Sequence, residues 1–185
     1  MMVTRWPRLF TFPLVTVERY FELPDPDGPY IRELHFGRLV EAGRPNRRHY
    51  NLQMLILDLL KKRLPARTWV VGVEMPYGLT PGYDCRAADV GVALRKKWDA
   101  DPEADCMIGL PHIVVQIKSR SNRDRRMEED AVLHITHGAH AVWLVKPDRR
   151  EVVAITASSR TVYTGNQAIP LPGSKSLSAA DIFSV

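Results

Sequence analysis

Two polar residues occupy the end of an apolar stretch of the chain, PHIVVQIKS at 111–119. The β-branched residues of this stretch predict a largely buried strand. Side chains alternate across a strand, so Gln116 and Lys118 share one face with Val114. Such a pair is either the place where the strand leaves the core or a chemical site. The spacing alone does not choose between these interpretations.

Asp89 completes a set of side chains that could hydrolyse a phosphodiester. It lies in a second predicted strand, RAADVGVAL at 86–94, on the face that carries the small residues of that strand. A carboxylate oxygen and an amide oxygen on neighbouring strands can ligate a hard cation such as Mg²⁺. A lysine ammonium beside them can activate water and offset the charge of a phosphoryl oxygen. Asp89, Gln116 and Lys118 therefore suggest metal-dependent hydrolysis, although Asp and Lys are also common at the ends of structural strands.

The charge of the chain favours an anionic partner. Its 185 residues include 26 lysines and arginines against 21 aspartates and glutamates, a formal net charge of +5. The positive charge is concentrated in the runs RPNRR at 44–48, LRKK at 94–97 and RSNRDRR at 120–126. Any one run is consistent with solvated surface. Together, and beside the motifs described here, the three runs favour nucleic acid.

The remaining pattern predicts the elements that position these residues. A helix is predicted over 44–65, where leucine and isoleucine recur with helical spacing and Pro65 prevents continuation. A short hairpin is expected at 31–43 with its turn at Gly37, and a second helix is expected from an N-cap at Asn122 to about residue 137. Further strands are predicted at 69–75, 86–94, 140–147, 151–156 and 160–165. This order predicts an α/β fold with a central mixed β-sheet flanked by helices.

The length and composition predict a single domain, 1–185, with an N-terminal arm over 1–30 and a loop-like tail over 168–185. Cys85 and Cys106 are expected to be reduced thiols, because a chain of this size does not need a disulfide. No stretch reaches the length of a membrane span, and prolines interrupt the apolar start of the chain. We therefore expect a cytoplasmic protein with no membrane partner.

Five short motifs occur in a characteristic order. They are ELHFGRLVE at 33–41, PNRRH at 45–49, RAADV at 86–90, PHIVVQIKSRS at 111–121 and GAHAVWLVKP at 138–147. Their order and spacing resemble those of the Uma-type family of restriction-endonuclease-like proteins, members of the PD-(D/E)XK nuclease superfamily. The resemblance covers about 33–163, and it implies a restriction-endonuclease-like core.

The resemblance implies a Mg²⁺-dependent endonuclease, with Mn²⁺ as a substitute, that hydrolyses phosphodiester bonds of DNA. It assigns catalytic roles to Asp89, Gln116 and Lys118, with Asp89 and Gln116 as metal ligands. Gln116 stands where the superfamily usually has Glu, and an amide keeps an oxygen but lacks the charge that holds Mg²⁺ most strongly. Glu41 or Glu74 is a candidate to supply the missing carboxylate. For each of them, a surface or salt-bridged carboxylate is the alternative.

The basic runs beside these motifs give five candidate nucleic-acid-binding residues: Arg47, Arg48, His49, Arg120 and Arg123. His49 is expected to contact a phosphate or to orient Glu41, and an ordinary residue at a helix start is an equal alternative. A homodimer is a further expectation, because related nucleases cut two strands. The competing hypotheses are a nuclease-like protein that binds nucleic acid without cutting it, and a structural protein that reuses the fold.

The run HITHGAH places His134, His137 and His140 at intervals of three. A zinc site is disfavoured, because the run crosses a helix end predicted at Gly138 and no paired cysteines assist. Asp130 and His134 stand where the resembled family usually has Lys and then Tyr. We expect helix-end and surface histidines here.

Overall fold

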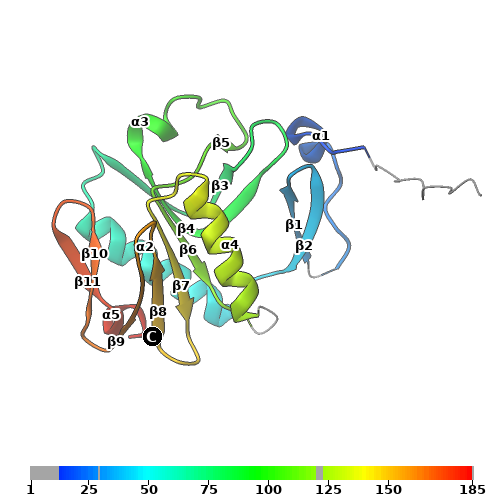
Figure 1. Cartoon of the computed structure of the whole chain (residues 1–185). Helices are drawn as coiled ribbons and strands as arrows, with labels where there is room; N and C mark the ends of the chain where they lie inside the picture. The colour runs from blue at the N-terminus through cyan, green and yellow to red at the C-terminus, as the bar shows by residue number, and fades with distance from the viewer. Residues whose placement is uncertain (1–12, 29, 120–122, 185) are drawn as a thin grey trace, which may run out of the picture.

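The computed structural model describes residues 13–28, 30–119 and 123–184 (Figure 1). Within these residues the centre is a seven-stranded sheet in the order β5-β3-β4-β6-β7-β8-β9. The strands are β3 (Trp69–Gly78), β4 (Arg86–Leu94), β5 (Met107–Ile108), β6 (Ile113–Ile117), β7 (Ala141–Lys146), β8 (Glu151–Ile155) and β9 (Arg160–Thr164). β6 runs parallel to β7 and β3 runs parallel to β5, whereas the other neighbours are antiparallel. The predicted α/β fold with a central mixed sheet is confirmed.

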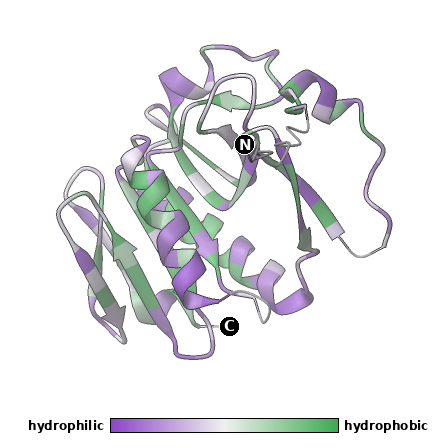
Figure 2. Ribbon diagram, turned by 45° about the vertical axis from the view of Figure 1, so that its right-hand side comes forward, coloured by the Kyte–Doolittle hydropathy of each residue, from purple (hydrophilic) through white to green (hydrophobic). Residues whose placement is uncertain are grey.

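A long helix covers each face of this sheet. α2 (Arg47–Arg63) buries Leu52, Ile56 and Leu60 in one core cluster, called here the α2 cluster, which also contains Val90, Val115 and Trp143. α4 (Asp124–Thr136) buries Met127 and Ala131 in a second cluster, the α4 cluster, which also contains Val114 and Leu144. In Figure 1 α4 lies in front of the sheet and α2 behind it. Figure 2 shows hydrophobic residues along the strands between them.

The start of α2 is fixed by a cap. The Asn46 side chain accepts a hydrogen bond from the His49 main-chain N–H at 3.0 Å, which satisfies one of the donors left free at a helix start. Arg47, Arg48 and His49 therefore form the first turn. At the other end, cationic residues occupy the last turn, where the helix dipole favours them, and Leu64 is already extended before Pro65.

The predicted hairpin is present as β1 (Tyr30–His35) and β2 (Arg38–Gly43), with Gly37 at φ 76° in its turn. It joins the central sheet at the start of β4, where Leu34 and Cys85 form an antiparallel bridge. α1 (Val17–Phe21) lies against the same hairpin, because the Tyr20 hydroxyl donates to the Arg32 carbonyl at 2.6 Å. The hairpin thus brings an early part of the chain to the edge of the region that holds Asp89.

The prediction of a loop-like tail over 168–185 is wrong for the residues of this segment that the structure describes. They form a second hairpin, β10 (Ala168–Leu171) with β11 (Lys175–Ser178), followed by α5 (Ala179–Ile182). Ile169, Leu177 and Ile182 are fully buried in the α2 cluster. Pro170 suggested a loop, but its side chain is exposed in a two-stranded hairpin, a position that tolerates proline.

Smaller departures concern the ends of elements. The polar loop expected after β4 begins with the short helix α3 (Arg95–Trp98), and β3 extends three residues beyond its predicted end. The N-cap of α4 is Arg123, while the predicted cap, Asn122, lies outside the described residues. Among the described helices, none is long and apolar enough to span a membrane.

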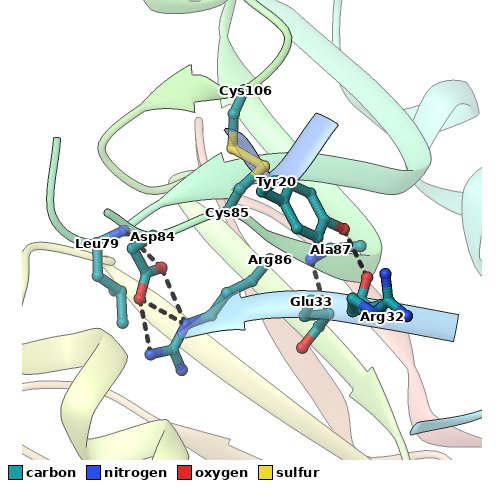
Figure 3. Close-up of a disulfide and its surroundings, with 9 residues drawn as sticks. All are labelled: Tyr20, Arg32, Glu33, Leu79, Asp84, Cys85, Arg86, Ala87 and Cys106. Atoms are coloured by element: carbon teal, nitrogen blue, oxygen red, sulfur yellow. Dashed lines mark hydrogen bonds and ion pairs between the residues drawn. A yellow bond between two sulfur atoms is a disulfide. The ribbon is translucent and has the colours of Figure 1, made fainter. Parts of the chain in front are cut away.

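The prediction of two reduced thiols is wrong, because Cys85 and Cys106 form a disulfide with their Cα atoms 6.0 Å apart (Figure 3). Cys85 directly precedes β4, and Cys106 directly precedes β5, which pairs with the end of β3. The β3–β4 pairing therefore brings the two residues together. The sequence argument considered only the size of the chain and could not see this pairing.

Candidate active site where strands β4 and β6 separate

Asp89 lies where β4 and β6 stop pairing. The ladder between these strands ends at Val90 and Val115. Beyond it, the Asp89 carboxylate takes over the role of a main-chain partner, because its Oδ2 accepts the Ile117 N–H at 2.5 Å. Its Oδ1 lies 2.8 Å from His49 Nε2. The carboxylate therefore links two strands and α2, with 15% of its side chain exposed.

Asp89 does not lie on the face that strand alternation predicts. Its contacts are with α2, whereas Gly91 packs closely on Met75 and Ala93 belongs to the α4 cluster. The cause is a break in alternation along both strands. Side chains change from one cluster to the other between Val73 and Met75 on β3 and between Ala88 and Val90 on β4. At the same level Glu74 has φ 46°, a left-handed conformation that is costly for residues other than glycine and is often found at functional sites.

Glu74 and Asp89 share a buried amide donor. Gln53, which is 3% exposed, donates its Nε2 to Glu74 Oε1 and lies 3.3 Å from Asp89 Oδ1. Desolvation and the charge of Asp89 raise the pKa of Glu74 above its usual value, although the hydrogen bond from Gln53 opposes the rise. Burial lowers the pKa of His49, but its hydrogen bond to Asp89 and the charges of both carboxylates raise it overall. Both carboxylates thus favour the protonated form of His49.

Gln116 and Glu33 meet the main chain of one residue, Ala87. Gln116 Nε2 donates to the Ala87 carbonyl at 3.3 Å. Glu33 Oε1 accepts the Ala87 N–H at 2.9 Å (Figure 3). Glu33 also lies 2.6 Å from the imidazole of His35. Sequence reasoning missed Glu33, although it opens the ELHFGRLVE motif. It also missed Gln53, and the available signal was its position between Leu52 and Met54 in the predicted helix.

Glu41 lies elsewhere. Its register partner across the hairpin is Arg32, with which it forms an ion pair at 3.7 Å. Cross-strand partners share a face and neighbouring residues alternate, so Glu41 is on the opposite face of the hairpin from Glu33. Glu41 is also half-exposed. Of the two candidates for the missing carboxylate, the structure brings Glu74 to Asp89 and leaves Glu41 away from it.

Lys118 is paired with the start of α4. Its ammonium contacts Asp124 Oδ1, and the other oxygen of this carboxylate lies 3.3 Å from Lys146 and 3.5 Å from Arg149. The hydrogen bond from Lys118 is the largest cause of a lowered pKa for Asp124. The ammonium predicted to face a phosphoryl oxygen is therefore engaged by a carboxylate that the sequence reading did not consider.

The predicted nucleic-acid-binding residues are distributed around α2 and α4. Arg47 and Arg123 are exposed, and Arg48 is exposed while pairing with Asp148 at 3.0 Å. His49 contacts Asp89 and not Glu41. Arg120 lies outside the described residues.

The three histidines of the HITHGAH run point to different surroundings. His134 is buried, with its Nε2 2.6 Å from the Tyr77 hydroxyl and its Nδ1 2.5 Å from the Asp130 carbonyl. His137 is exposed at the end of α4, and His140 stacks on His112 with ring centroids 4.4 Å apart. The divergence predicted from the helix end is present, but the expectation of surface histidines is wrong for His134.

The donor chemistry near Asp89 is that of a hard cation. Asp89 and Glu74 are carboxylates close enough that the charge of one raises the pKa of the other, and such a pair favours a bound positive charge. Gln116, on the adjacent strand, directs its amide N–H to the Ala87 carbonyl, and Lys118 pairs with Asp124, so the contacts of these two side chains are not with Asp89. Within the described parts of the chain, however, no three His, Cys, Asp or Glu side chains form a ready metal cluster. The residues therefore suit a weakly held cation that keeps most of its waters, as Mg²⁺ does.

Comparison with known proteins gives a family and a fold. The family model "Uma2: Putative restriction endonuclease" matches residues 17–184. The chain also resembles a solved structure from Anabaena variabilis ATCC 29413, described as a putative nuclease belonging to DUF820. The TM-score is 0.77 at 19% identity, over 92% of this chain and 98% of that chain. No curated protein matches the sequence.

Proposed function

Because the chain belongs to the family described as "Uma2: Putative restriction endonuclease", we propose that it is a metal-dependent endonuclease that hydrolyses phosphodiester bonds of DNA. The observation that carries this proposal is the cluster of Asp89, Glu74 and His49 where β4 and β6 separate. A carboxylate with a raised pKa, Glu74, near Asp89 and beside exposed basic residues suits a polyanionic substrate and a cation.

Each residue of the site has a proposed role. Asp89, Glu74 and Gln116 would hold Mg²⁺ or Mn²⁺ through oxygen atoms. The metal, when bound, would polarise a phosphoryl oxygen and make a bound water more acidic. Gln53 orients both carboxylates from α2. Lys118 would offset charge on the phosphoryl group when a phosphate replaces its partner Asp124.

The test is cleavage of supercoiled plasmid by the purified protein in a series of divalent metals. We expect nicked and linear products with Mg²⁺ or Mn²⁺ and none with EDTA. Asp89→Asn should abolish cleavage, whereas Asp99→Asn should not, because Asp99 is an exposed carboxylate that pairs with Arg95 on α3. Equal cleavage by wild type and Asp89→Asn would refute the proposal.

A second candidate is a protein that binds nucleic acid without cutting it. Two observations favour it: an amide replaces the usual carboxylate at Gln116, and Lys118 is already paired. Binding without cleavage in either metal would select this function. In both cases the Arg47→Ala, Arg48→Ala double variant should bind all sequences less tightly and with a smaller dependence on salt, because phosphate contacts release counterions.

We also propose a cytoplasmic location and a homodimer, on the reasoning that a DNA nuclease meets its substrate inside the cell and that two strands require two sites. The disulfide removes one argument for the cytoplasm, because disulfides are rare there. Its burial, with Cys85 5% and Cys106 8% exposed, would slow reduction. Analytical ultracentrifugation tests the dimer, and thiol labelling in intact cells tests the state of the cysteines.

A further inference from the structure

Two side chains complete the edge of β4 beyond its pairing with β6. The ladder between these strands ends at Val90 and Val115, but both main-chain groups of Ala87 still have partners. The Ala87 N–H donates to Glu33 Oε1 at 2.9 Å, as Figure 3 shows, and the Ala87 carbonyl accepts Gln116 Nε2. The N–H and C=O of one strand residue point to the same edge of the strand. The Glu33 carboxylate and the Gln116 amide therefore lie beside each other.

The hairpin that carries Glu33 holds this carboxylate in place. The next residue, Leu34, is fully buried and exchanges two main-chain hydrogen bonds of 2.8 Å with Cys85. Glu33 Oε2 lies 2.6 Å from the His35 imidazole. A carboxylate offers about four lone-pair sites, so both oxygens can accept a further donor. Because 22% of the Glu33 side chain is exposed, water can reach it.

The negative charge of Glu33 reaches the Asp89 cluster. Ala87, which Glu33 contacts, is two residues before Asp89, a distance of about 7 Å along a strand. Burial is the largest cause of the raised pKa of Glu74, and the charges of Asp89 and Glu33 add to it. The field at this site therefore includes three carboxylates, one of which belongs to the N-terminal hairpin.

From this arrangement we infer that Glu33 supplies to the cation site the negative charge that Gln116 lacks. Among the described residues no three His, Cys, Asp or Glu side chains could hold a metal together, so Glu33 acts through water carried by the ion. Mg²⁺ keeps several of its waters when it binds, and such a water donates to a carboxylate that the ion itself does not touch. Glu33 is thus a positioning residue. This inference rests on the proposed function for the presence of the cation, but metal binding can be measured without cleavage.

The test measures Mn²⁺ affinity by calorimetry in the absence of DNA. Glu33→Gln keeps an acceptor for the Ala87 N–H and removes the charge, so Mn²⁺ should bind roughly 10- to 100-fold less tightly. Chemical denaturation in EDTA should show that the variant remains folded. Glu41→Gln is the matched control, because Glu41 is a half-exposed carboxylate on the opposite face of the same hairpin. It should bind Mn²⁺ as the wild type does.

A charge exchange separates the charge of Glu33 from its hydrogen bond. The double variant Glu33→Gln, Gln116→Glu has the net charge of the wild type, with the carboxylate moved to β6. It should recover the Mn²⁺ affinity that Glu33→Gln loses, because a negative charge at either neighbouring position favours the cation. Failure to recover it would overturn the inference, since the loss would then come from the contact with Ala87.

Two further outcomes would overturn the inference. One is equal Mn²⁺ affinity of Glu33→Gln and Glu41→Gln, and the other is a wild-type protein that binds no Mn²⁺ without DNA. Plasmid cleavage is scored separately. If the wild type does not cut plasmid but Glu33→Gln loses Mn²⁺ affinity and the exchange restores it, the proposed nuclease activity fails and the role of Glu33 stands. If the wild type cuts plasmid and Glu33→Gln binds Mn²⁺ normally, the nuclease activity stands and the role of Glu33 fails.

Discussion

At the scale of single residues, the Asp89 carboxylate combines structural and chemical roles. It caps the Ile117 N–H at the point where two strands separate, and it contacts the His49 imidazole. A buried main-chain donor that loses its acceptor costs about 1–3 kcal/mol. Any variant at this position therefore changes stability as well as charge, so activity must be compared among variants with measured stability. For this reason Asp89→Asn, which keeps one acceptor oxygen, is a better probe than Asp89→Ala.

Gln116→Glu tests whether this amide is a metal ligand or only the polar end of a strand. If its oxygen ligates the metal, the added charge should tighten Mg²⁺ binding, and cleavage should hold or rise, most clearly at low Mg²⁺. Plasmid cleavage against Mg²⁺ concentration measures this. Gln116→Met is the control for the lost hydrogen bond to the Ala87 carbonyl, and it should weaken metal binding. An unchanged Mg²⁺ requirement in both variants would leave Gln116 as the polar end of a strand.

His134 should make the protein less stable in mild acid. Burial lowers its pKa below 6.5, outweighing the hydrogen bond to the Asp130 carbonyl. The unfolded chain therefore binds this proton more readily, and the stability contributed by neutral His134 is present above pH 6.5 and is lost as the pH falls below it. For one proton, the free energy of unfolding changes by at most about 1.4 kcal/mol per pH unit. Urea unfolding at several pH values measures it.

In the His134→Gln variant, the free energy of unfolding should fall less steeply with acid than in the wild type. His137→Gln, at the exposed C-cap of the same helix, is the control for removing an imidazole from this part of the protein. Parallel curves for the wild type and His134→Gln would mean that His134 titrates alike in the folded and unfolded chains.

At the scale of elements, close packing between β3 and β4 supports the site. Gly91 lies directly opposite Gly72, and a Cβ at Gly91 would meet Met75 Cβ at 2.8 Å and Sδ at 2.4 Å. A Cβ at Gly72 would meet Met75 Cε at an ordinary 3.5 Å. Gly91→Ala should therefore lower the free energy of unfolding by about 1–3 kcal/mol, while Gly72→Ala should change it far less. Chemical denaturation measures both, and equal losses would contradict this account.

Whether an element can be predicted from the sequence depends on whether it is determined by its own residues or by contacts with distant segments. The bounds of β4 and the apolar face of α2 were predictable, because the valines of one and the helical spacing of the other are properties of the segment itself. The second hairpin was not, because burial of Ile169 and Leu177 depends on α2, which is far away in the sequence. Asp89 was identified but placed on the wrong face, because the left-handed backbone of Glu74 on the next strand cannot be read from alternation. Glu33 was missed because its role depends on where the hairpin meets Ala87.

At the scale of the whole molecule, the disulfide closes a loop whose ends are 21 residues apart. The loop contains β4 with Asp89, so the cross-link restricts the unfolded chain around the site. Replacing both cysteines by serine should lower the free energy of unfolding by about 2–4 kcal/mol. Thermal denaturation measures the loss. A thiol titration of the wild type, denatured without reductant, should find no free thiol, and two free thiols would contradict the pairing.

The bridge between Leu34 and Cys85 has a consequence for how the protein folds. Contacts between distant parts of a chain form slowly, because a long loop must close before any pairing compensates its entropy. The β3–β4 hairpin is local and can form early, whereas the N-terminal hairpin that carries Glu33 must find the start of β4 across the intervening chain. During refolding, the far-UV circular dichroism signal should therefore recover before the proposed DNA cleavage does. The delay between the two recoveries would be the time that the N-terminal hairpin takes to dock on β4.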